Sequence, residues 1–600
     1  MKEKFIPTGN EFISLPCIRE EDAAILDFTF LHMGYKGLID VRGTKQTPLF
    51  TPFISINGLD KTVQNVKWSK KNDWIPYFIG FADQLKVYGT IVAPIGERGF
   101  AYRLKFVNET ESNLRFSAGL KGEWGDTYHS INEDKKLIAP KFYYQSGWNH
   151  SYIFDMRLGT SIFAFAPMFN CEITSSCDLR ENGNINYRFE KEIFLAKGEE
   201  FIFESYWGLG FEEVSAATSA KEMLRHGFDW ELLQTKQWLA SRSKLLKDEE
   251  MNSIFNTNLF FNFFYASGRT LDTEELVLVT SRSPRYYVSA AYWDRDSLLW
   301  SFPSILITDA EYAREMLMYI FTRQIRNIGI HSRYIDGTLL EPGFELDELC
   351  APIIALYNYV KTTHDYNFLK LDVVQNGVNH VLKILDSKKH KNIALYETFL
   401  QPTDDMHVYP YITYDNVLVW KSLQNLSEIY SGIWEEHRIS SLIIKAKEVE
   451  EAIYMHCVKV YEGKKMFAWS VDINGKWDIY DEPPGSLQLL PHYGFCDSKD
   501  EIYSNTVDII RRPEYPYSFH DSYIADIGCP HAPHPWILSI ANSLLCDRVE
   551  HGKTMLLRAS MDNGIACESV DENTGECATG EAFATCAGFL AYAIYEAFSN

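Results

Sequence analysis

The feature that most constrains the fold is a change of hydrophobic period about a third of the way along the chain. From about residue 10 to residue 210, segments such as Ala101–Asn108 and Leu114–Leu120 alternate apolar and polar residues. Turn signals such as Asn182–Asn184 and Lys197–Glu200 separate them. Many short strands without intervening helices predict a β-sandwich. Beyond this part the period becomes helical.

The helical part begins with a segment that we expect to link two domains. Its apolar residues fall on one helical face, and a second group continues that face: first Ala216, Ala217, Ala220, Met223 and Leu224, then Trp230, Leu233, Trp238 and Leu239. From Glu249 onwards, further helical repeats alternate with loops rich in Gly, Pro, Asp and Trp. Examples are Ala310–Asn327, Ala351–Thr362, Asn416–Ser431 and Ser440–Tyr461.

The C-terminal part is long enough for about a dozen helices of ordinary length. A toroid of six helical hairpins, the (α/α)6 barrel, fits that number, although the number alone does not distinguish it from a helical solenoid. We therefore expect a multidomain β + α chain: an N-terminal β-sandwich over residues 1–211, a helical linker over 212–248, and a C-terminal (α/α)6 barrel over 249–600.

The charge balance narrows the class of partner. The chain has 58 Lys and Arg against 81 Asp and Glu, a net charge of −23. Nucleic acid and anionic membranes require clustered basic residues, so we expect neither as the main partner, although a local basic pocket remains possible. The 14 Trp, 35 Tyr and 38 Phe fit either a large β-rich core or surfaces that stack on sugar rings.

The N-terminal residues, the longest apolar run and the cysteines predict the cellular compartment of the protein. The N-terminal residues lack the apolar region of a secretory signal. The longest apolar run, Leu298–Thr308, is interrupted by Pro303 and is too short to span a bilayer. The 11 cysteines show neither CxxC pairs nor metal-ligand spacing, and we expect them to be reduced. These features predict a cytoplasmic protein.

Four acidic loop segments carry the candidate chemistry, and the first is Ala291–Trp300. One interpretation is a capped helix, with Asp296 and Ser297 as N-caps and a local Asp–Arg pair. The other is a sugar-binding fork, in which Arg295 and Asp296 bind hydroxyl groups and Trp293 supplies an apolar face.

The second segment, Glu341–Cys350, places four carboxylates in eight residues at the start of an apolar helix. The preference of helix N-termini for negative charge explains some of them. Glu345 and Asp347 are the candidates for binding sugar hydroxyls.

The third segment, Phe399–Tyr411, contains the adjacent acids Asp404 and Asp405 among aromatic residues that include Tyr409. Adjacent acids repel and aromatic neighbours desolvate, so the pKa of one acid is expected to be raised, as a general acid requires. The alternative is a simple Asx-turn.

The fourth segment, Asn563–Gly588, is an acidic loop that leads into the last apolar helix, Phe583–Phe598, and Glu568 is the acid most expected to point inward. Beside these segments, Ile527–Ile537 contains His531 and His534. Prolines forbid a regular helix there, and no acid or cysteine in the segment completes a ligand set, so we expect a sugar-contacting loop and no metal.

Together these segments resemble the metal-independent exo-α-1,6-mannosidases of glycoside hydrolase family 125, within the wider group of inverting (α/α)6 glycosidases. Three runs are similar to the family's Ala-Met-Trp-Leu-Arg-Asp-Ser, Arg-Pro-Ser-Asp-Asp-Ala and Pro-Ser-Leu-Leu-Ser-Leu-Pro-Tyr-Leu-Gly: Ala291–Ser297, Gln401–Met406 and Pro484–Gly494. Three more follow in the family's order: Ile502–Thr506, Tyr515–Tyr517 and Ile527–His531. Gln401 replaces the family's Arg, and Glu482-Pro-Pro replaces its Asp-Ala-Asn-Val.

The resemblance implies roles for individual residues. The last segment is also similar to the base loop of glucoamylases, which puts Glu568 on the catalytic base. The family's acid is an aspartate of the Asp-Asp pair, hence Asp404 or Asp405. Asp294, Arg295 and Asp296 would hold the non-reducing sugar, and the N-terminal half resembles the β-sandwich of bacterial glucoamylases.

The predicted function is exo-acting, inverting hydrolysis of terminal α-linked sugars from oligosaccharides, with an α-mannoside favoured and no cofactor. Inversion implies carboxylates roughly 6.5–9.5 Å apart. The alternatives are an α-glucosidase, glucoamylase-type or debranching hydrolase with the same carboxylates, or a sugar-binding protein without catalysis. A phosphorylase would not need Glu568, and an epimerase or lyase would rely on His, Tyr or Lys.

Overall fold

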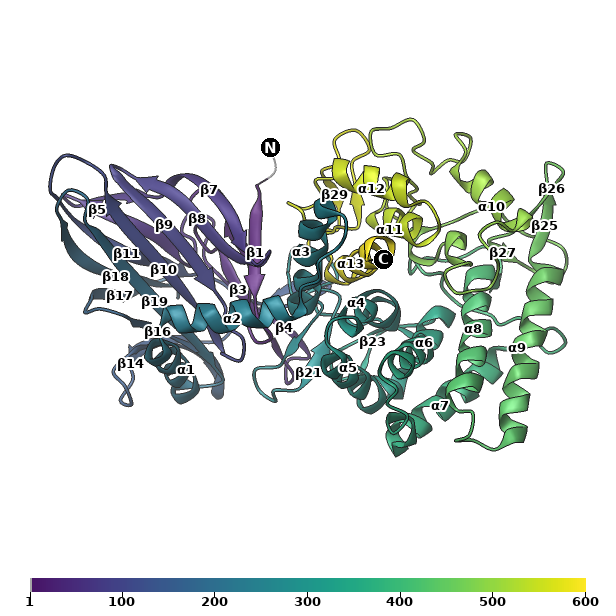
Figure 1. The fold of residues 1–600 in the computed structure, drawn as a ribbon. Coiled ribbons are helices and arrows are strands. Elements are labelled where there is room, and N and C mark those ends of the chain that lie inside the picture. Colours follow the sequence, from purple (N-terminus) through teal and green to yellow (C-terminus); the bar gives the residue numbers. More distant parts are fainter. Residues whose placement is uncertain (1–2, 600) are drawn as a thin grey trace. The chain divides into compact units, whose positions relative to one another are not determined.

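The computed structural model describes residues 3–599, and the chain divides into two compact units (Figure 1). Unit 1 comprises Met1–Ser243, Phe263–Val277 and Ser281–Ala290, and unit 2 comprises Lys244–Asn262, Leu278–Thr280 and Ala291–Asn600. Unit 1 is rich in antiparallel sheet and unit 2 is mainly helical. The predicted change from strands to helices along the chain is therefore confirmed.

Unit 1 contains three antiparallel sheets. The six-stranded sheet has the order β1 (Phe5–Gly9), β2 (Ser14–Arg19), β3 (Asp27–His32), β4 (Gly37–Arg42), β12 (Thr127–Ile131), β13 (Glu133–Lys136). The eight-stranded sheet has the order β14 (Lys141–Gln145), β15 (Tyr152–Leu158), β16 (Thr160–Phe169), β19 (Glu200–Gly210), β10 (Gly99–Asn108), β9 (Leu85–Val92), β8 (Ile75–Ala82), β7 (Gln64–Lys71). The five-stranded sheet has the order β17 (Thr174–Leu179), β18 (Ile185–Leu195), β11 (Leu114–Trp124), β5 (Thr51–Ile56), β6 (Leu59–Thr62).

The alternating segments of the sequence are strands of these sheets. The second half of β10 alternates buried and half-buried residues, because successive side chains of a strand point to opposite faces. The predicted turns are also in place: Gly183 lies in the loop before β18 and Gly198 in the loop after it, with left-handed φ angles of 82° and 78°. An L side chain rarely adopts that conformation, so glycine fits both turns.

The core that these sheets enclose is strongly aromatic. The indole of Trp207 lies at its centre, with the ring of Phe50 at 4.5 Å and that of Tyr187 at 5.7 Å between centroids. Part of the aromatic content of the chain is therefore used in this core.

Two helices complete unit 1, α1 (Glu213–His226) and α2 (Phe228–Arg242), and α1 packs on β16 and β19. The predicted face of α1 is confirmed for Ala216, Ala217, Ala220 and Met223, which are buried. The predicted continuation through Trp230 and Leu233 is wrong, since both are exposed. Gly227, with φ of 83°, ends α1, so α2 starts with a new phase and buries other positions.

Unit 2 is built from helices joined by loops and short strand pairs. The helices are α3 (Glu249–Tyr265, whose last residues belong to unit 1), α4 (Phe302–Leu306), α5 (Ala310–Thr322), α6 (Leu346–Thr363), α7 (Asp372–Lys388), α8 (Thr413–Ile429), α9 (Glu436–His456), α10 (Glu501–Arg511), α11 (Ile537–Leu545), α12 (Val549–Arg558) and α13 (Ala584–Phe598). A π-helical turn, η1 (Arg295–Ser301), precedes α4, and short 3-10 turns cover Gln324–Asn327, Phe368–Lys370, Pro483–Gly485 and Leu487–Leu489.

The short strands of the rest of the chain form two-stranded pairs. They are β20 (Ser267–Arg269) with β21 (Leu276–Leu278), β22 (Ile330–Arg333) with β23 (Leu339–Phe344), β24 (Tyr411–Ile412) with β27 (Ser470–Val471), β25 (Val458–Tyr461) with β26 (Lys464–Phe467), and β28 (Ser569–Val570) with β29 (Cys577–Thr579). Several of these pairs lie at helix ends and shape the loops that carry the acidic segments.

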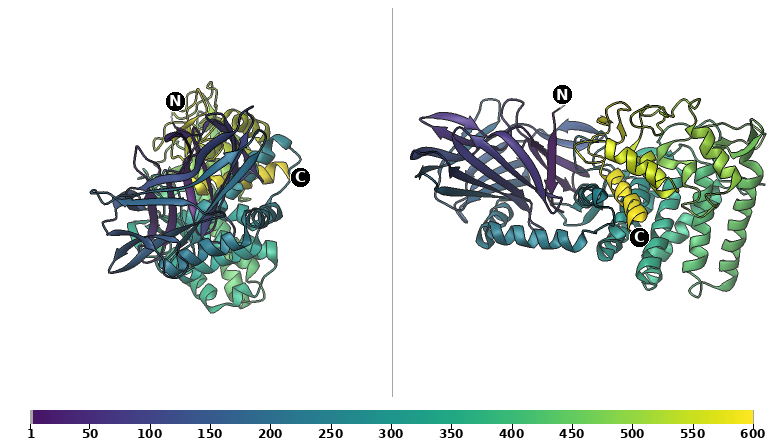
Figure 2. Two further views of the ribbon diagram at one scale, coloured as in Figure 1. Left: turned by 90° about the vertical axis from the view of Figure 1, so that its left-hand side faces the viewer. Right: turned by 45° about the horizontal axis from the view of Figure 1, so that its top comes forward.

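The predicted helices are confirmed in position, with differences at their ends. The segment predicted at Ala310–Asn327 is α5 followed by a 3-10 turn, and the one predicted at Ser440–Tyr461 is α9 followed by β25. Helices close in sequence pack together: α8 lies along α9 and α6, and α11 lies along α12 and α13. The pairing of α8 with α9 is visible in Figure 1, and Figure 2 shows the same fold from two other directions.

Two further expectations concern membranes and cysteines. Over residues 3–599 the structure contains no helix of the length and apolarity that crossing a membrane requires. All 11 cysteines are free thiols, as expected from the sequence.

Candidate active site

Four carboxylates of unit 2 gather around the guanidinium of Arg295, whose residue is 1% exposed at the start of η1. Its Nη1 donates to Glu345 at 2.8 Å and to Asp347 at 2.9 Å, and its Nη2 donates to Asp404 at 2.6 Å. Glu348 lies 3.8 Å from Nη2. We call Arg295, Glu345, Asp347, Asp404 and the adjacent His331 the arginine cluster. It brings three of the four predicted segments to one point.

The first turn of α6 supplies the acids of this cluster. Glu345 is the N-cap of α6, and Asp347 and Glu348 lie in its first turn, where the helix dipole favours negative charge. The carboxylate of Glu348 also accepts the backbone N–H groups of Asp294 and Arg295. A carboxylate from a distant helix therefore fixes the start of η1.

This arrangement corrects one expectation about the first segment. Asp296 and Ser297 do not cap the helix there: Asp296 accepts a hydrogen bond from the hydroxyl of Thr585 on α13 at 2.7 Å. Burial raises the pKa of Asp296 to about 7. Tertiary contacts thus replace the local cap that the spacing predicts.

Asp294 and Trp293 are buried beside the cluster. Asp294 accepts hydrogen bonds from the Tyr292 hydroxyl at 2.5 Å and from Arg333, and it is inaccessible. Trp293 is 3% exposed, and its ring meets that of His331 edge-on at 5.5 Å. Contacts of these two residues with a sugar remain a prediction.

His331, on β22, adds a second cation to the cluster. Its Nδ1 lies 2.5 Å from Glu345 and 3.5 Å from Asp404. Burial opposes a charged ring, but Asp404 and Glu345 outweigh it and raise the pKa of His331 to about 11. The imidazole is therefore protonated at neutral pH.

The charges of the cluster set the protonation of its acids. Burial opposes ionisation of Asp404, but the charges of Arg295 and His331 prevail and lower its pKa to about 2. Burial, together with the charge of Asp404, raises the pKa of Glu345 to about 7. Asp404 is therefore held as a carboxylate.

Glu482 fixes the turn that carries Asp404 and Asp405 by accepting hydrogen bonds from Thr403, the residue before them. This buried acid accepts hydrogen bonds from the backbone N–H of Thr403 at 2.9 Å, from its hydroxyl at 2.8 Å and from Tyr480 at 3.1 Å. Asp404 itself has a left-handed φ of 67°, a conformation that Asp tolerates better than most residues. The two adjacent acids consequently have different partners.

Asp405 belongs to a second group, formed by Asp405, His531 and Glu568, which we call the imidazole bridge. Nδ1 of His531 lies 3.1 Å from Asp405, and Nε2 lies 3.8 Å from Glu568. Glu568 is 3% exposed, whereas the side chain of Asp405 is half exposed. One imidazole ring therefore lies between the predicted acid and the predicted base.

Glu568 is oriented by the short β28–β29 pair. Its carboxylate accepts a hydrogen bond from the hydroxyl of Thr579 at 2.6 Å, and its backbone N–H donates to Gly580. Of the other predicted residues, Tyr409 is half-buried in the loop that follows Asp405. His534, next to His531, contacts Glu572 at 2.9 Å.

Two groups of side chains have the composition of a metal site. The first is His331, Glu345 and Asp404. Here the ring is protonated and Arg295 occupies the same carboxylates, whereas a metal requires a neutral imidazole.

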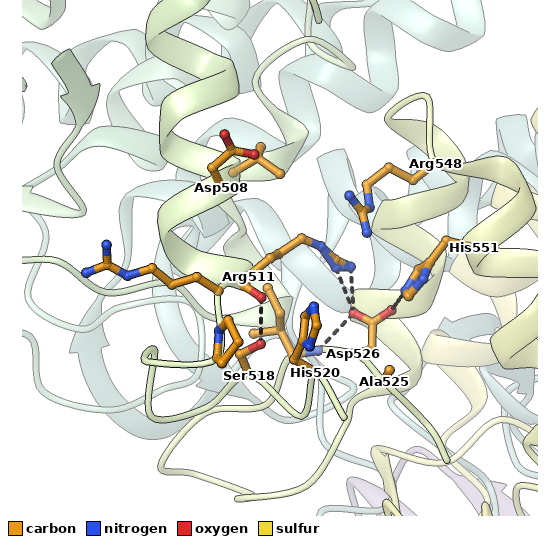
Figure 3. Close-up of a pocket in the computed structure, with 12 residues that line it drawn as sticks. Asp508, Arg511, Ser518, His520, Ala525, Asp526, Arg548 and His551 are labelled. Atoms are coloured by element: carbon orange, nitrogen blue, oxygen red, sulfur yellow. Dashed lines mark hydrogen bonds and ion pairs between the residues drawn. The ribbon is translucent and has the colours of Figure 1, made fainter. Parts of the chain in front are cut away.

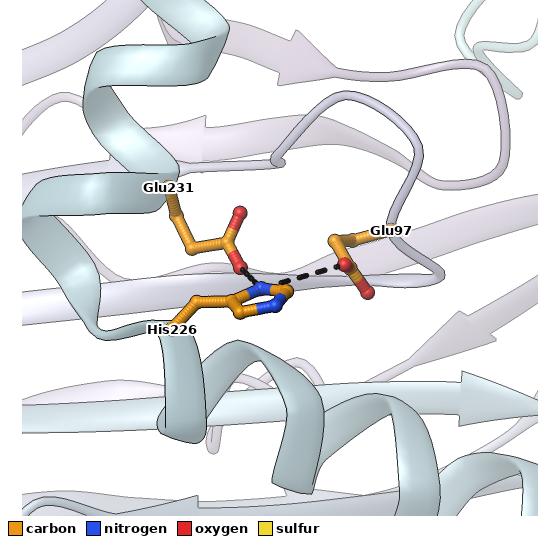
Figure 4. Close-up of side chains that lie close together, drawn as sticks. All are labelled: Glu97, His226 and Glu231. Atoms are coloured by element: carbon orange, nitrogen blue, oxygen red, sulfur yellow. Dashed lines mark hydrogen bonds and ion pairs between the residues drawn. The ribbon is translucent and has the colours of Figure 1, made fainter.

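The second group is Glu97, His226 and Glu231 of unit 1 (Figure 4). Nδ1 of His226 lies 2.8 Å from Glu231, and its Nε2 lies 2.9 Å from the guanidinium of Arg225. A cation at this point would meet the charge of Arg225. The group instead ties the end of α1 to the start of α2.

Sequence reasoning missed several residues of the site: Glu348, His331, Glu482, Arg333 and Thr579. A signal for Glu348 exists, because Glu345 and Glu348 are three residues apart at a helix start and share one face. For Arg333 and Glu482 no local pattern was available, since their partners Asp294 and Thr403 are 39 and 79 residues away. Thr579 and His331 are nearer to their partners, but no helical or strand spacing in the sequence marks these pairs.

Comparison with known proteins relates part of this chain to a family of glycosidases. Residues 386–595 match the family of metal-independent alpha-mannosidases (GH125). This region contains Asp404, Asp405, His531 and Glu568, whereas Arg295 and Glu345 precede it. A stretch of 189 residues, 30% of the chain, is 25% identical to the meiotically up-regulated gene 157 protein of Schizosaccharomyces pombe, of which it covers 37%.

Three solved structures share the fold. A bacterial glucoamylase complexed with acarbose has a TM-score of 0.67 at 13% identity and covers 99% of this chain and 94% of its own. A putative kojibiose phosphorylase from the human microbiome has a TM-score of 0.65 at 11% identity, with 99% and 86% covered. A Streptococcus pneumoniae metal-independent α-mannosidase in a non-productive complex with α-1,6-mannobiose has a TM-score of 0.50 at 18% identity, with 57% and 93% covered.

The chain has the fold of known glycosidases. Residues 386–595 resemble the metal-independent α-mannosidases, and the fold is similar to that of the bacterial glucoamylase over 99% of the chain.

Proposed function

We propose that this chain is an exo-acting, inverting glycoside hydrolase that releases terminal α-linked sugars from oligosaccharides, with an α-mannoside as the favoured substrate. In this proposal unit 1 is a β-sandwich and unit 2 is an (α/α)6 barrel whose loops form the active site. The cytoplasmic location suggested by the sequence stays a prediction. The observation that carries the proposal is the imidazole bridge, which keeps Asp405 and Glu568 apart at one site.

Asp405 is the better candidate for the general acid. Asp404 is bound to Arg295 and His331, and its pKa of about 2 leaves no proton to donate at neutral pH. Asp405 is half exposed and contacts a single titratable partner, His531. The acid would protonate the glycosidic oxygen as the bond to the anomeric carbon breaks.

Glu568 is the proposed general base. It would remove a proton from a water molecule that attacks the anomeric carbon from the opposite face. The hydrogen bond from Thr579 orients its carboxylate. A gap that accommodates an imidazole ring between the two acids favours the wider spacing of inverting enzymes over the direct attack of a retaining nucleophile.

In this proposal the arginine cluster is the part of the active site that binds the non-reducing sugar. Arg295, Asp404 and Glu345 are charged or ionisable groups in a fixed geometry, which suits the recognition of several hydroxyl groups. Asp296 and Trp293, which were predicted from the segment that contains Arg295, would complete this sugar-binding part of the site.

The test combines activity with stereochemistry. Dinitrophenyl α-mannoside should be hydrolysed faster than the corresponding α-glucoside, and fresh product should be the β-anomer by NMR. A first-formed α-anomer would contradict inversion, and absence of turnover on any α-glycoside combined with calorimetric sugar binding would favour a non-catalytic binding protein.

A second candidate, an α-glucosidase of the glucoamylase type, has its own support. The similarity to the bacterial glucoamylase extends over 99% of this chain, including unit 1. Gln401 and Glu482 also replace the residues typical of the mannosidase family. The same pair of substrates distinguishes the two candidates, because a preference for the α-glucoside would favour the second.

A further inference from the structure

Unit 2 contains a cavity, outside the proposed active site, with a volume of about 470 Å³ (Figure 3). The end of α10, the loop that follows it and the start of α12 line this cavity. Arg511, Arg512, Arg548, His520 and His551 contribute to its wall, on a chain with a net charge of −23. So many basic groups in one cavity of an acidic chain indicate a ligand of negative charge.

One carboxylate, Asp526, neutralises part of this charge. It accepts hydrogen bonds from Arg511 at 2.9 Å and from His551 at 3.0 Å, as Figure 3 shows. Burial opposes its ionisation, but Arg511 and His551 lower the pKa of Asp526 to about 2. Arg512 is paired with Glu462 at 2.8 Å. These pairs give Arg511 and Arg512 carboxylate partners, but neither pair includes Arg548.

Arg548 has no carboxylate partner within residues 3–599. Its Nε is buried without a hydrogen-bond acceptor, and so is the Nε of Arg511. Burial and the neighbouring charge of Arg511 lower the pKa of Arg548. In Figure 3 its guanidinium points toward the pair formed by Arg511 and Asp526, while the carboxylate of Asp508 points away from that pair.

Buried donors without acceptors are rare in native proteins and call for a missing partner. A guanidinium presents its donors in a planar fork that matches the oxygens of a phosphate group. We propose that this cavity binds the phosphate group of a small phosphorylated molecule, with Arg548 as its principal ligand.

The size and lining of the cavity suit an ester better than the free ion. Its volume lies in the usual range for small-molecule sites and exceeds what one phosphate ion fills. Val507, Pro513, Ala525 and Ile527 also line the wall, together with the polar Asp508 and Ser518, and the first four offer an apolar surface to an organic portion. This inference does not depend on the proposed hydrolytic activity.

Isothermal titration of the full chain with glucose 6-phosphate, inorganic phosphate and glucose tests the proposal. Glucose 6-phosphate should bind, and R548Q should weaken that binding about 10- to 100-fold, the loss expected for a charge-assisted hydrogen bond. Any binding of glucose at the proposed active site should be unaffected by R548Q. If inorganic phosphate binds as tightly as the ester, and with the same dependence on Arg548, the free ion is the source of the phosphate group.

The matched control is R558Q, which removes the same charge from the same helix at an exposed residue that donates to a backbone carbonyl. R558Q should leave the affinity unchanged. R548K, which keeps the charge without the planar fork, should bind more weakly than wild type but more tightly than R548Q, and it replaces R548Q if that variant does not fold. Equal dependence of glucose binding on Arg548, equal loss in R558Q, or no loss in either Arg548 variant would overturn the proposal.

Discussion

The arginine cluster and the imidazole bridge meet at the peptide bond between Asp404 and Asp405, but they hold these two acids in opposite ways. Asp404 contacts two cations and is ionised. Asp405 contacts one imidazole and is half exposed. Since identical side chains at adjacent positions differ so much, the surroundings decide which acid is suited to proton transfer and which to binding.

The largest expected effect is on the imidazole bridge. Replacing Glu568 with Gln should lower kcat by about 10⁴-fold, because a general base is lost, while Thr579 can still donate to the amide oxygen. Steady-state kinetics on an α-glycoside measure this. E572Q, on the same loop and paired with His534, is the control and should retain its activity; comparable losses in both variants would contradict the assignment of the base.

The proposed difference in role between Asp404 and Asp405 is tested by replacing each acid with its amide. D405N should lower kcat by about 10²- to 10³-fold on natural substrates, and by much less on dinitrophenyl glycosides, whose leaving group needs no proton. D404N should raise KM more than it lowers kcat, because it weakens the sugar-binding part of the site. If D404N instead shows the dependence on the leaving group, the roles of the two acids must be reversed.

The arginine cluster should dominate stability. Replacing Arg295 with Met removes the cation that pairs with the buried carboxylates of Glu345 and Asp347, which should reduce the free energy of unfolding by about 3–5 kcal/mol. Denaturant unfolding measures this change. R314M removes an exposed arginine that pairs with Asp365, and it should cost about 1 kcal/mol or less. Equal effects would show that the cluster is not a stabilising centre.

A smaller, pH-dependent effect on the free energy of unfolding is expected when His331 is replaced. Its pKa is raised from an unfolded value of about 6.5 to about 11, so its contribution to stability is complete below pH 6.5 and is lost as the pH rises towards 11. H331Q should therefore be less stable than wild type by about 1.5–3 kcal/mol at pH 6. The difference should shrink at pH 9.5 in unfolding experiments, and a difference that grows with pH would contradict a protonated His331.

The sequence predicted the elements better than the contacts between them. Periodicity located strands such as β10 and helices such as α8, because burial of one face leaves a local pattern. It failed at α2, because Gly227 resets the helical phase, and at Asp296, because its partner Thr585 is almost 300 residues away.

The same limit applies to the site. The acidic segments could be found in the sequence, but adjacency alone gave no reason to prefer Asp405 over Asp404. That preference depends on Arg295 and His331, which tertiary packing brings to one of the two acids. The roles assigned to all these residues remain predictions until the variants are measured.

The left-handed backbone of Asp404 has a consequence for protein engineering. Glycine and asparagine tolerate a φ of 67°, whereas β-branched residues are strained there. A library randomised at this position and selected for thermal stability alone should thus retain aspartate, asparagine and glycine and lose valine, isoleucine and threonine. Adding selection for turnover should remove asparagine and glycine, so the two sorted pools would separate the demands of the backbone from those of the substrate.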